Sequence, residues 1–208
     1  GPQSALYISW GSLLFPQKYI DVLIHALLEQ DQLMPFVFAA SSWDAVLPPS
    51  LKEEVDQSGR GIIVHWAPQQ AVPAHPALGW MLTHCGSGGM SECLTRGVPL
   101  LAWPLFWDQP AHALWLSQVL DVAFEFLQVR EGPVKGLAYR AGGLNVEGTR
   151  EAVRREVREV LGMCRGEEGR RKRENALRVR GRVWEAVGQG GQVQRHLEEL
   201  GRFLWRGK

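Results

Sequence analysis

The stretch THCGSGGMSEC, residues 83–93, holds the groups of this sequence that are best suited to bind an anion. Glycines at positions 86, 88 and 89 stand between an apolar run that ends at Thr83 and a segment of helix-forming residues. Glycine allows the backbone to approach a ligand closely. The free N–H groups and the dipole of a helix N-terminus favour phosphate. The stretch therefore predicts a phosphate-binding turn, although it lacks the Lys-Ser/Thr ending of a P-loop and the spacing of a dinucleotide fingerprint.

Two polar side chains beside this turn have both a functional and a structural interpretation. His84 stands at the carboxyl end of a predicted strand, where a lone histidine is usually structural but a neighbouring phosphate turn favours a binding role. Glu92 lies in the first turns of the following helix. Its carboxylate can interact favourably with the helix N-terminus, or it can accept hydrogen bonds from ribose hydroxyls.

Two further segments could bind a base and a sugar. Trp66 follows a predicted strand that ends at His65. An aromatic residue in that position is usually part of the core, but its ring could also stack on a base. Asp108 and Gln109 open a predicted helix, where Asp is a good N-cap residue. Together they could instead hold several sugar hydroxyls, because the Gln109 amide offers both a donor and an acceptor.

The elements that must position these residues alternate between short apolar strands and amphipathic helices. Strands are predicted at 5–9, 36–39, 61–65, 80–83, 98–102 and 122–126, with helices at 17–30 and 51–57. This alternation predicts an α/β fold in which helices cover both faces of a parallel sheet. Ligands of such sheets bind beyond the carboxyl ends of the strands. The Gly11-Ser12 turn and the glycine turn after Thr83 both fall at that edge.

The last third of the chain has a different pattern. Residues 127–148 are rich in glycine and have little periodicity, which predicts a surface loop. From Glu147 onward the pattern is helical, and Gly190-Gly191 separates the last two helices. Apolar residues form three stripes at helical spacing: Val153, Val157, Val160 and Leu161; Ala176, Val179, Val183 and Val187; Val193, Leu197, Leu200 and Leu204.

The composition limits the classes of function. Of the 208 residues, 45% are hydrophobic and 22% are charged, which is typical of a globular protein. A net charge of +1 argues against nucleic-acid binding through bulk charge, and the basic stretch Arg165–Arg182 is interleaved with glutamates, as in a solvated helix face. Three cysteines leave an odd thiol and show no metal spacing, so we expect a reducing compartment such as the cytoplasm. No apolar run approaches the length of a membrane span, and no signal peptide is evident.

Taken together, the motifs resemble those of the UDP-dependent glycosyltransferases, whose plant members carry a signature known as the secondary product glycosyltransferase box. The spacing of the signature matches without gaps: 18 positions from Trp66 to His84, 8 to Glu92 and 16 more to Asp108. The matching segments are Trp66-Ala-Pro-Gln69, His75-Pro76, Thr83-His84-Cys85-Gly86, Glu92, Gly97-Val98-Pro99, Trp103-Pro104-Leu105 and Asp108-Gln109. Weaker similarity to the opening strand and to the C-terminal helices of the family extends the resemblance to nearly the whole chain.

The resemblance implies two Rossmann-like domains that face each other across a cleft, the GT-B fold. Residues 1–208 correspond to the second, donor-binding domain, with the C-terminal helices from about residue 149 onward included in it. Nothing in the sequence corresponds to the first, acceptor-binding domain, and there is no initiator Met. We therefore expect either a fragment or excised domain, or a natural donor-binding subunit that acts with a partner.

The resemblance also implies a role for each site residue. Trp66 would stack on uracil, and Ala67 would present its backbone to the edge of the base. Gln69 and Glu92 would hold the nucleoside, with Glu92 on the ribose hydroxyls. The diphosphate would bind to Ser12, His84 and the turn Ser87-Gly88-Gly89, and the sugar to Asp108 and Gln109. Plant members usually have Trp-Asn-Ser where this chain has Ser87-Gly88-Gly89, so backbone N–H groups replace side-chain donors here.

The reaction implied is inverting transfer of a hexose, with glucose expected, from UDP to a hydroxyl of a small-molecule acceptor. The family's catalytic base lies in the first domain, so no catalytic residue is expected in this segment, and the segment alone is expected to be inactive. His84 and the helix N-terminus would stabilise the leaving UDP in place of a metal ion. No cofactor, metal, nucleic acid or membrane span is expected. A domain that binds a UDP-sugar without turnover is the remaining alternative.

Overall fold

A computed structural model describes residues 2–13, 15–132 and 146–205. Its centre is a six-stranded sheet with the strand order β3-β2-β1-β4-β5-β6, in which every neighbouring pair is parallel. The strands are β1 (Ala5–Ser9), β2 (Phe36–Ala39), β3 (Gly61–Val64), β4 (Leu78–Thr83), β5 (Leu100–Ala102) and β6 (Ala123–Glu125). All the predicted strands are confirmed. β5 begins later than predicted because Pro99 has no N–H to donate to the ladder.

The strands are mostly apolar because both faces of the sheet are covered, and the edge strand β3 is the most exposed of them. Successive side chains of a strand point to opposite faces. In β1, Ile8 therefore belongs to the core on one face, while Tyr7 belongs to the core on the other. In β4, Leu82 and Met81 divide in the same way, and Leu82 pairs with Ile8. The predicted α/β class with two covered faces is confirmed.

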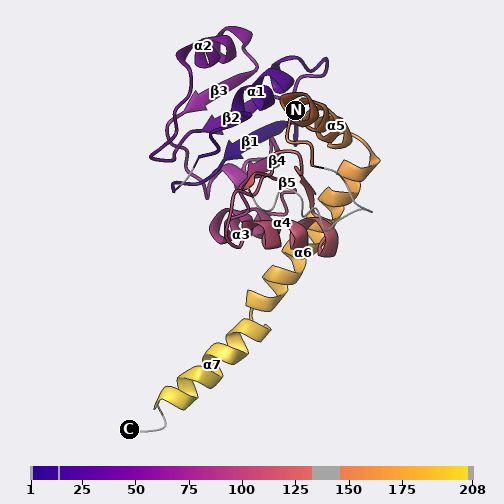
Figure 1. Ribbon diagram of the computed structural model, residues 1–208. Helices are drawn as coiled ribbons and strands as arrows, with labels where there is room; N and C mark the ends of the chain where they lie inside the picture. Colours follow the sequence, from indigo (N-terminus) through magenta and orange to yellow (C-terminus); the bar gives the residue numbers. More distant parts are fainter. Residues whose placement is uncertain (1, 14, 133–145, 206–208) are drawn as a thin grey trace.

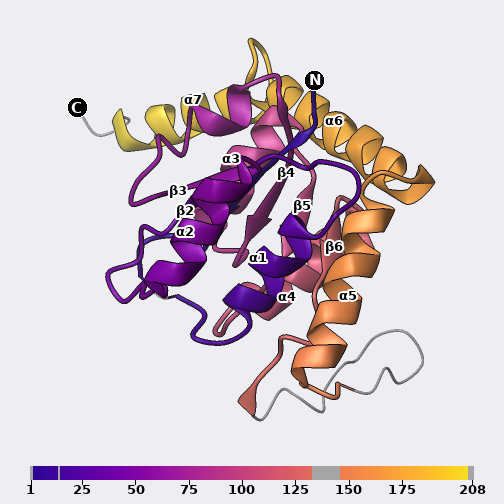
Figure 2. The ribbon, with the colours of Figure 1, turned by 90° about the horizontal axis from the view of Figure 1, so that it is seen from above.

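Helices cover both faces of the sheet, as Figures 1 and 2 show from two directions. One face is covered by α1 (Ile20–Leu28), α2 (Pro49–Ser58) and α5 (Arg150–Met163), and the other by α3 (Ser87–Arg96), α4 (Gln109–Leu114) and α6 (Glu167–Val187). Two short helices, η1 (Val72–Ala74) and the π-helical turn η2 (Trp115–Val119), complete the layers. Helix α1 starts later than predicted because Tyr19 is in the left-handed conformation, with φ 66°.

The order of the strands reverses between β1 and β4. From β1 the chain continues to β2 and β3 on one side, and from β4 it continues to β5 and β6 on the other. The loops that leave the carboxyl ends of β1 and β4 therefore diverge and leave a crevice between them. Ligands of open α/β sheets bind at such switch points.

The C-terminal part contains the three predicted apolar stripes on helices, and the structure buries them to different degrees. Val153, Val157 and Leu161 of α5 are fully buried. Thr149 caps α5, its Oγ1 accepting a hydrogen bond from the Ala152 N–H at 3.1 Å, so the helix begins at Arg150 and not at Glu147. Of the predicted surface loop, residues 133–145 lie outside the described residues.

The apolar stripe of α6 is partly buried, whereas that of α7 (Gln192–Trp205) is exposed. In α6, Ala176 is buried, Val179 packs against the core, and Val187 at the end of the stripe is exposed. Helix α7 has no buried residue and extends away from the sheet (Figure 1). Helical periodicity predicts which side chains share a face, but not whether another element packs on that face.

Within the described residues, no helix is long and apolar enough to cross a membrane.

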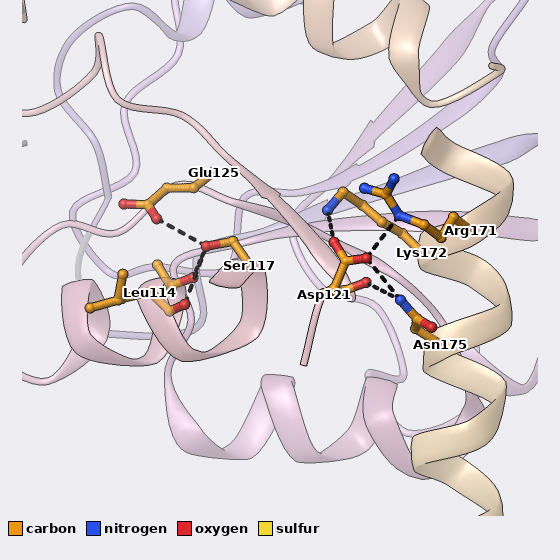
Figure 3. A network of polar contacts seen from close by, with 8 residues as sticks. Leu114, Ser117, Asp121, Glu125, Arg171, Lys172 and Asn175 are labelled. Atoms are coloured by element: carbon orange, nitrogen blue, oxygen red, sulfur yellow. Dashed lines mark hydrogen bonds and ion pairs between the residues drawn. The ribbon is translucent and has the colours of Figure 1, made fainter. Parts of the chain in front are cut away.

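Asp121 joins helix α6 to the edge of the sheet (Figure 3). Its carboxylate accepts hydrogen bonds from Lys172 Nζ at 2.7 Å and from Arg171 Nε and Asn175 Nδ2 at 2.9 Å each. Lys172 is only 5% exposed, and its Nζ lies 4.7 Å from the centre of the Phe124 ring. Several cations of the basic stretch 165–182 therefore have partners within the chain, which favours the structural interpretation of that stretch.

The same contacts set the charge state of Asp121. Burial raises the pKa of Asp121, but the hydrogen bonds and positive charges of Lys172 and Arg171 outweigh this and hold the pKa below its ordinary value of 3.8. A carboxyl whose pKa is lower in the folded state stabilises the fold above its unfolded pKa. This stabilisation is lost as the pH falls through the folded value.

We predict that Asp121→Asn lowers the free energy of unfolding by about 1–3 kcal/mol at neutral pH, because it leaves the buried Lys172 ammonium without its counter-charge. Asparagine tolerates the left-handed backbone of this position, where φ is 51°. Urea denaturation measures the loss, with Asp56→Asn on the exposed side of α2 as the control. Equal stability of the two variants would contradict the assignment.

Candidate functional site

A cleft of about 520 Å³ opens at the carboxyl ends of β1 and β4, where the strand order reverses. Its walls come from the segments that follow β1, β2, β3, β4 and β5. The sequence-predicted residues that line it are Ser12, Trp66, Ala67, Gln69, His84, Ser87, Gly88, Gly89 and Gln109. Residues that are up to 97 positions apart in the sequence thus meet at one edge of the sheet.

Two predicted residues, Glu92 and Asp108, do not line the cleft themselves. Glu92 lies behind it on α3, where its Oε2 accepts a hydrogen bond from Gln69 Nε2 at 2.8 Å. Asp108 stands at the N-cap position of α4, but its side chain makes no capping hydrogen bond and is 63% exposed. The capping interpretation of Asp108 is therefore wrong; its carboxylate lies 3.8 Å from His112 Nδ1, and the next residue, Gln109, lines the cleft.

The N-terminus of α3 points free donors at the cleft. The helix begins at Ser87 after the N-cap residue Gly86, and no side chain caps it. The Met90 N–H is bonded to the Gly86 carbonyl at 3.1 Å, whereas the N–H groups at the start of a helix have no intrahelical acceptor. Ser87, Gly88 and Gly89, which carry these groups, line the cleft. The helix dipole adds partial positive charge at the same place, so the site suits an anion.

Two of the three glycines near His84 are required by the space that its side chain occupies, and the third is not. A Cβ on Gly86 would lie 2.3 Å from His84 Nε2, and one on Gly11 would lie 3.0 Å from His84 Cε1. Both glycines therefore leave room for the imidazole, and Gly11 also has a positive φ of 79°. A Cβ on Gly88, in contrast, would meet nothing within 4 Å. Packing gives no reason for glycine at position 88.

The His84 imidazole lies between Gly11 and Gly86, and one of its nitrogens makes no hydrogen bond with the described residues. Its Nδ1 is buried and has no hydrogen-bond partner among the described residues, so the interpretation of His84 as a satisfied structural histidine is wrong. Burial lowers the pKa of His84 below its ordinary value of 6.5, and the negative charge of Asp108 offsets this only in part. The ring is therefore neutral at pH 7, and an anion bound beside it would raise its pKa.

Trp66 presents its ring to solvent. Its side chain is 69% exposed and forms part of the cleft wall, so the core interpretation of this residue is wrong. Ala67, next to it, is buried. An exposed indole face on the wall of a cleft can stack on a flat ligand group such as a base.

One of the two polar atoms of the Gln109 amide, the oxygen, is already hydrogen-bonded within the protein. The residue is 5% exposed, and its Oε1 accepts hydrogen bonds from the backbone N–H of Leu105 at 2.8 Å and of Phe106 at 3.2 Å. Two N–H donors face this atom, which identifies it as the oxygen and leaves Nε2 for a ligand. The expectation that Gln109 offers a ligand both a donor and an acceptor is therefore wrong, because its acceptor holds the 105–106 backbone.

Sequence reasoning missed several residues of the cleft wall, among them Ser41, Phe106 and Trp107. Ser41 could have been found, since it follows β2 at the same edge as the other residues. Trp107 follows β5 at the same edge; it is 78% exposed and has a positive φ of 55°, which is uncommon for a bulky residue. Among the described residues, no group of three or more His, Cys, Asp or Glu side chains could hold a metal ion.

Comparison with known proteins assigns the chain to a family. A family profile described as "UDP-glucoronosyl and UDP-glucosyl transferase" matches residues 1–131. The chain belongs to the UDP-glycosyltransferase family. UDP-glycosyltransferase eriJ of Hericium erinaceus is 42% identical over 165 residues, which cover 77% of this chain and 32% of that protein. A putative UDP-glucose glucosyltransferase of Fragaria ananassa is 33% identical over 206 residues, covering 96% of this chain and 40% of the relative.

Solved structures of UDP-glycosyltransferases share the fold. Os79 from O. sativa in complex with UDP has a TM-score of 0.73 and 27% identity, covering 96% of this chain and 40% of that one. Phytolacca americana UGT2, complexed with UDP-2fluoro-glucose and pterostilbene, has a TM-score of 0.70 and 25% identity, with 96% and 41% covered. The fold is that of the C-terminal half of GT-B enzymes, which confirms the predicted fold. The chain spans about two fifths of the length of these two structures.

We predict that alanine has opposite effects at two glycines of this UDP-glycosyltransferase domain. Gly88→Ala is expected to stabilise the fold by about 0.5–1 kcal/mol, because alanine favours the helix and its Cβ meets nothing. Gly86→Ala is expected to destabilise it by about 1–3 kcal/mol, because the Cβ displaces the His84 ring. Urea denaturation compares the two. A loss of stability in Gly88→Ala would show that packing does require this glycine.

Proposed function

We propose that this chain is the donor-binding half of an inverting UDP-sugar glycosyltransferase that transfers a hexose to an acceptor hydroxyl. The observation that carries the proposal is the cleft at the switch point, which combines a free helix N-terminus, an exposed indole and an unpartnered histidine nitrogen. Each of these suits a different part of a nucleotide sugar. The UDP bound to Os79 and the UDP-2fluoro-glucose bound to Phytolacca americana UGT2 support the same assignment.

The nucleoside would bind to the segment after β3 and to α3. Trp66 stacks on uracil, and the backbone of Ala67 reaches the edge of the base. Gln69 donates to one carboxylate oxygen of Glu92, which orients that group and leaves its remaining acceptor sites for the ribose hydroxyls. Glu92 thus acts beside the cleft wall rather than as part of it.

The diphosphate would bind where the α3 N–H groups, Ser12 and His84 meet. As the bond to the sugar breaks, negative charge grows on the leaving UDP. The helix N-terminus already faces that charge and does not have to reorganise. His84 can take up a proton as the neighbouring charge raises its pKa, and so contributes a positive charge of its own. We propose that these groups act without a metal ion or other cofactor.

The remaining part of the reaction would come from an acceptor-binding domain. A base there removes the proton of the acceptor hydroxyl, and the oxygen then attacks the anomeric carbon from the side opposite UDP, which inverts its configuration. This chain alone would bind the donor without transferring the sugar. The acceptor domain could belong to the same polypeptide or to a partner subunit, and a non-catalytic UDP-sugar-binding domain is the other alternative. A cytoplasmic location, which the odd number of cysteines favours, stays a prediction.

We predict that Trp66→Ala raises the Kd for UDP about tenfold or more, because stacking on a base contributes about 1–3 kcal/mol. Isothermal titration calorimetry measures the change. Trp43→Ala is the matched control, since Trp43 is 79% exposed, follows β2 and does not line the cleft. Its affinity for UDP is expected to stay unchanged. Absence of UDP binding by the unmodified chain at millimolar ligand would refute the donor site itself.

The sugar would be recognised by Asp108 as acceptor and Gln109 Nε2 as donor. The equatorial 4-hydroxyl of glucose and the axial one of galactose point in different directions, so only one sugar satisfies both groups. A buried polar group left unpaired costs about 1–3 kcal/mol, which corresponds to a preference of roughly tenfold. We therefore expect UDP-glucose to be preferred to UDP-galactose.

Gln109→Glu tests this preference. Glutamate keeps an oxygen for the Leu105 and Phe106 N–H groups, so the backbone stays in place, but the Nε2 donor is lost. We predict that the ratio of UDP-glucose to UDP-galactose use falls toward one. Donor competition in an enzyme that includes the acceptor-binding domain measures the ratio. Equal use of both sugars by the unmodified enzyme, or an unchanged ratio in the variant, would contradict the prediction.

A further inference from the structure

Cys85 is the strained residue of the turn that leads into α3. Cys85 is fully buried and has a φ of 66°, which is uncommon for a residue other than glycine. Such a conformation persists only where the surroundings hold it in place. One support is local: the Cys85 N–H lies 3.3 Å from Thr83 Oγ1.

The second support comes from a different element. His112, on α4, has its Nδ1 at 2.9 Å from the Cys85 carbonyl oxygen. A carbonyl only accepts hydrogen bonds, so Nδ1 must carry the proton and donate. The same Nδ1 lies 3.8 Å from Asp108 Oδ2, one helical turn earlier. One imidazole thus contacts both the turn before α3 and the carboxylate that we assign to the sugar.

The direction of this hydrogen bond determines what the turn presents to the cleft. The Cys85–Gly86 peptide is trans, so the Gly86 N–H points opposite to the Cys85 carbonyl. With the carbonyl held toward α4, the N–H points away from α4. Gly86 lines the cleft, whereas His112 does not.

A rotation of this peptide would also move His84. The position of a Cβ on Gly86 lies only 2.3 Å from His84 Nε2, so the backbone of Gly86 and the imidazole are in close contact. The hydrogen bond from His112 therefore fixes two groups that face a bound anion, the Gly86 N–H and the His84 ring. It touches neither the base-binding wall at Trp66 nor Glu92.

We propose that His112 is a positioning residue for the diphosphate, which acts by holding the Cys85–Gly86 peptide and not by touching the ligand. This inference rests on the proposed function, because it concerns the same cleft. A role in stability alone would affect the binding of every part of the nucleotide equally. A positioning role affects the diphosphate and leaves the nucleoside unchanged, so uridine and UDP together separate the two roles.

The experiment measures the Kd of UDP and of uridine, by NMR titration, for the unmodified chain and for His112 variants. His112→Ala is expected to raise the Kd for UDP about five- to tenfold, as loss of one hydrogen bond does, and to leave the Kd for uridine unchanged. His112→Asn is expected to restore most of the UDP affinity, because the asparagine Nδ2 can occupy the place of the histidine Nδ1 and donate to the same carbonyl. His196→Ala, on the exposed face of α7, is the matched control.

Each other outcome has a defined meaning. Equal losses for uridine and UDP, or no loss for either, would overturn the positioning role. If His112→Ala does not fold, His112→Phe keeps a ring, removes the donor and must show the same selective loss of UDP affinity. If the unmodified chain binds uridine and UDP equally well, no diphosphate site exists and the inference fails. If it binds neither, the proposed function itself fails.

Discussion

Strands β1 and β4 are parallel neighbours with one register shift near Leu6, and the chain continues from them to opposite sides of the sheet. This constraint creates the cleft. Because the two connections diverge, they leave a crevice between them at the ends of the two strands. Everything in the site depends on it: the Gly11 turn, the His84 imidazole and the start of α3 are neighbours only because β1 and β4 are.

The start of α3 departs from the pattern usual in plant members of the family. Ser87-Gly88-Gly89 supplies three N–H groups and only one polar side chain, so under our proposal this segment would hold an anion mainly through its backbone. A backbone site needs its peptides held in fixed orientations, since it has no flexible side chain that can adjust to the ligand. The hydrogen bond between His112 and Cys85 and the close fit of His84 against Gly86 meet that need.

Much of the fold and the list of cleft residues could be predicted from the sequence, for identifiable reasons. Buried parallel strands appear as apolar runs, and residues just after such runs must meet at one edge. The orientation of the Gln109 amide could not be predicted, because it depends on backbone N–H groups of a segment with no regular structure. The contact between His112 and Cys85 joins residues on two different elements, and nothing in their spacing indicates it. The start of α5 was predicted too early because Thr149, a good N-cap residue, was overlooked.

The contacts of the last two helices divide the C-terminal part into regions of different local stability. Helix α6 is bound to the rest of the domain from Arg171 to Trp184, whose indole N–H donates to the Thr95 carbonyl at 2.9 Å. Beyond Gly188, the side chains of Gln194, Arg195 and Arg202 make hydrogen bonds within α7 and the preceding glycine turn, and α7 has no buried residue. Amide hydrogens of α7 can therefore exchange with solvent through local opening, whereas those in the first half of α6 exchange only when the sheet edge opens as well.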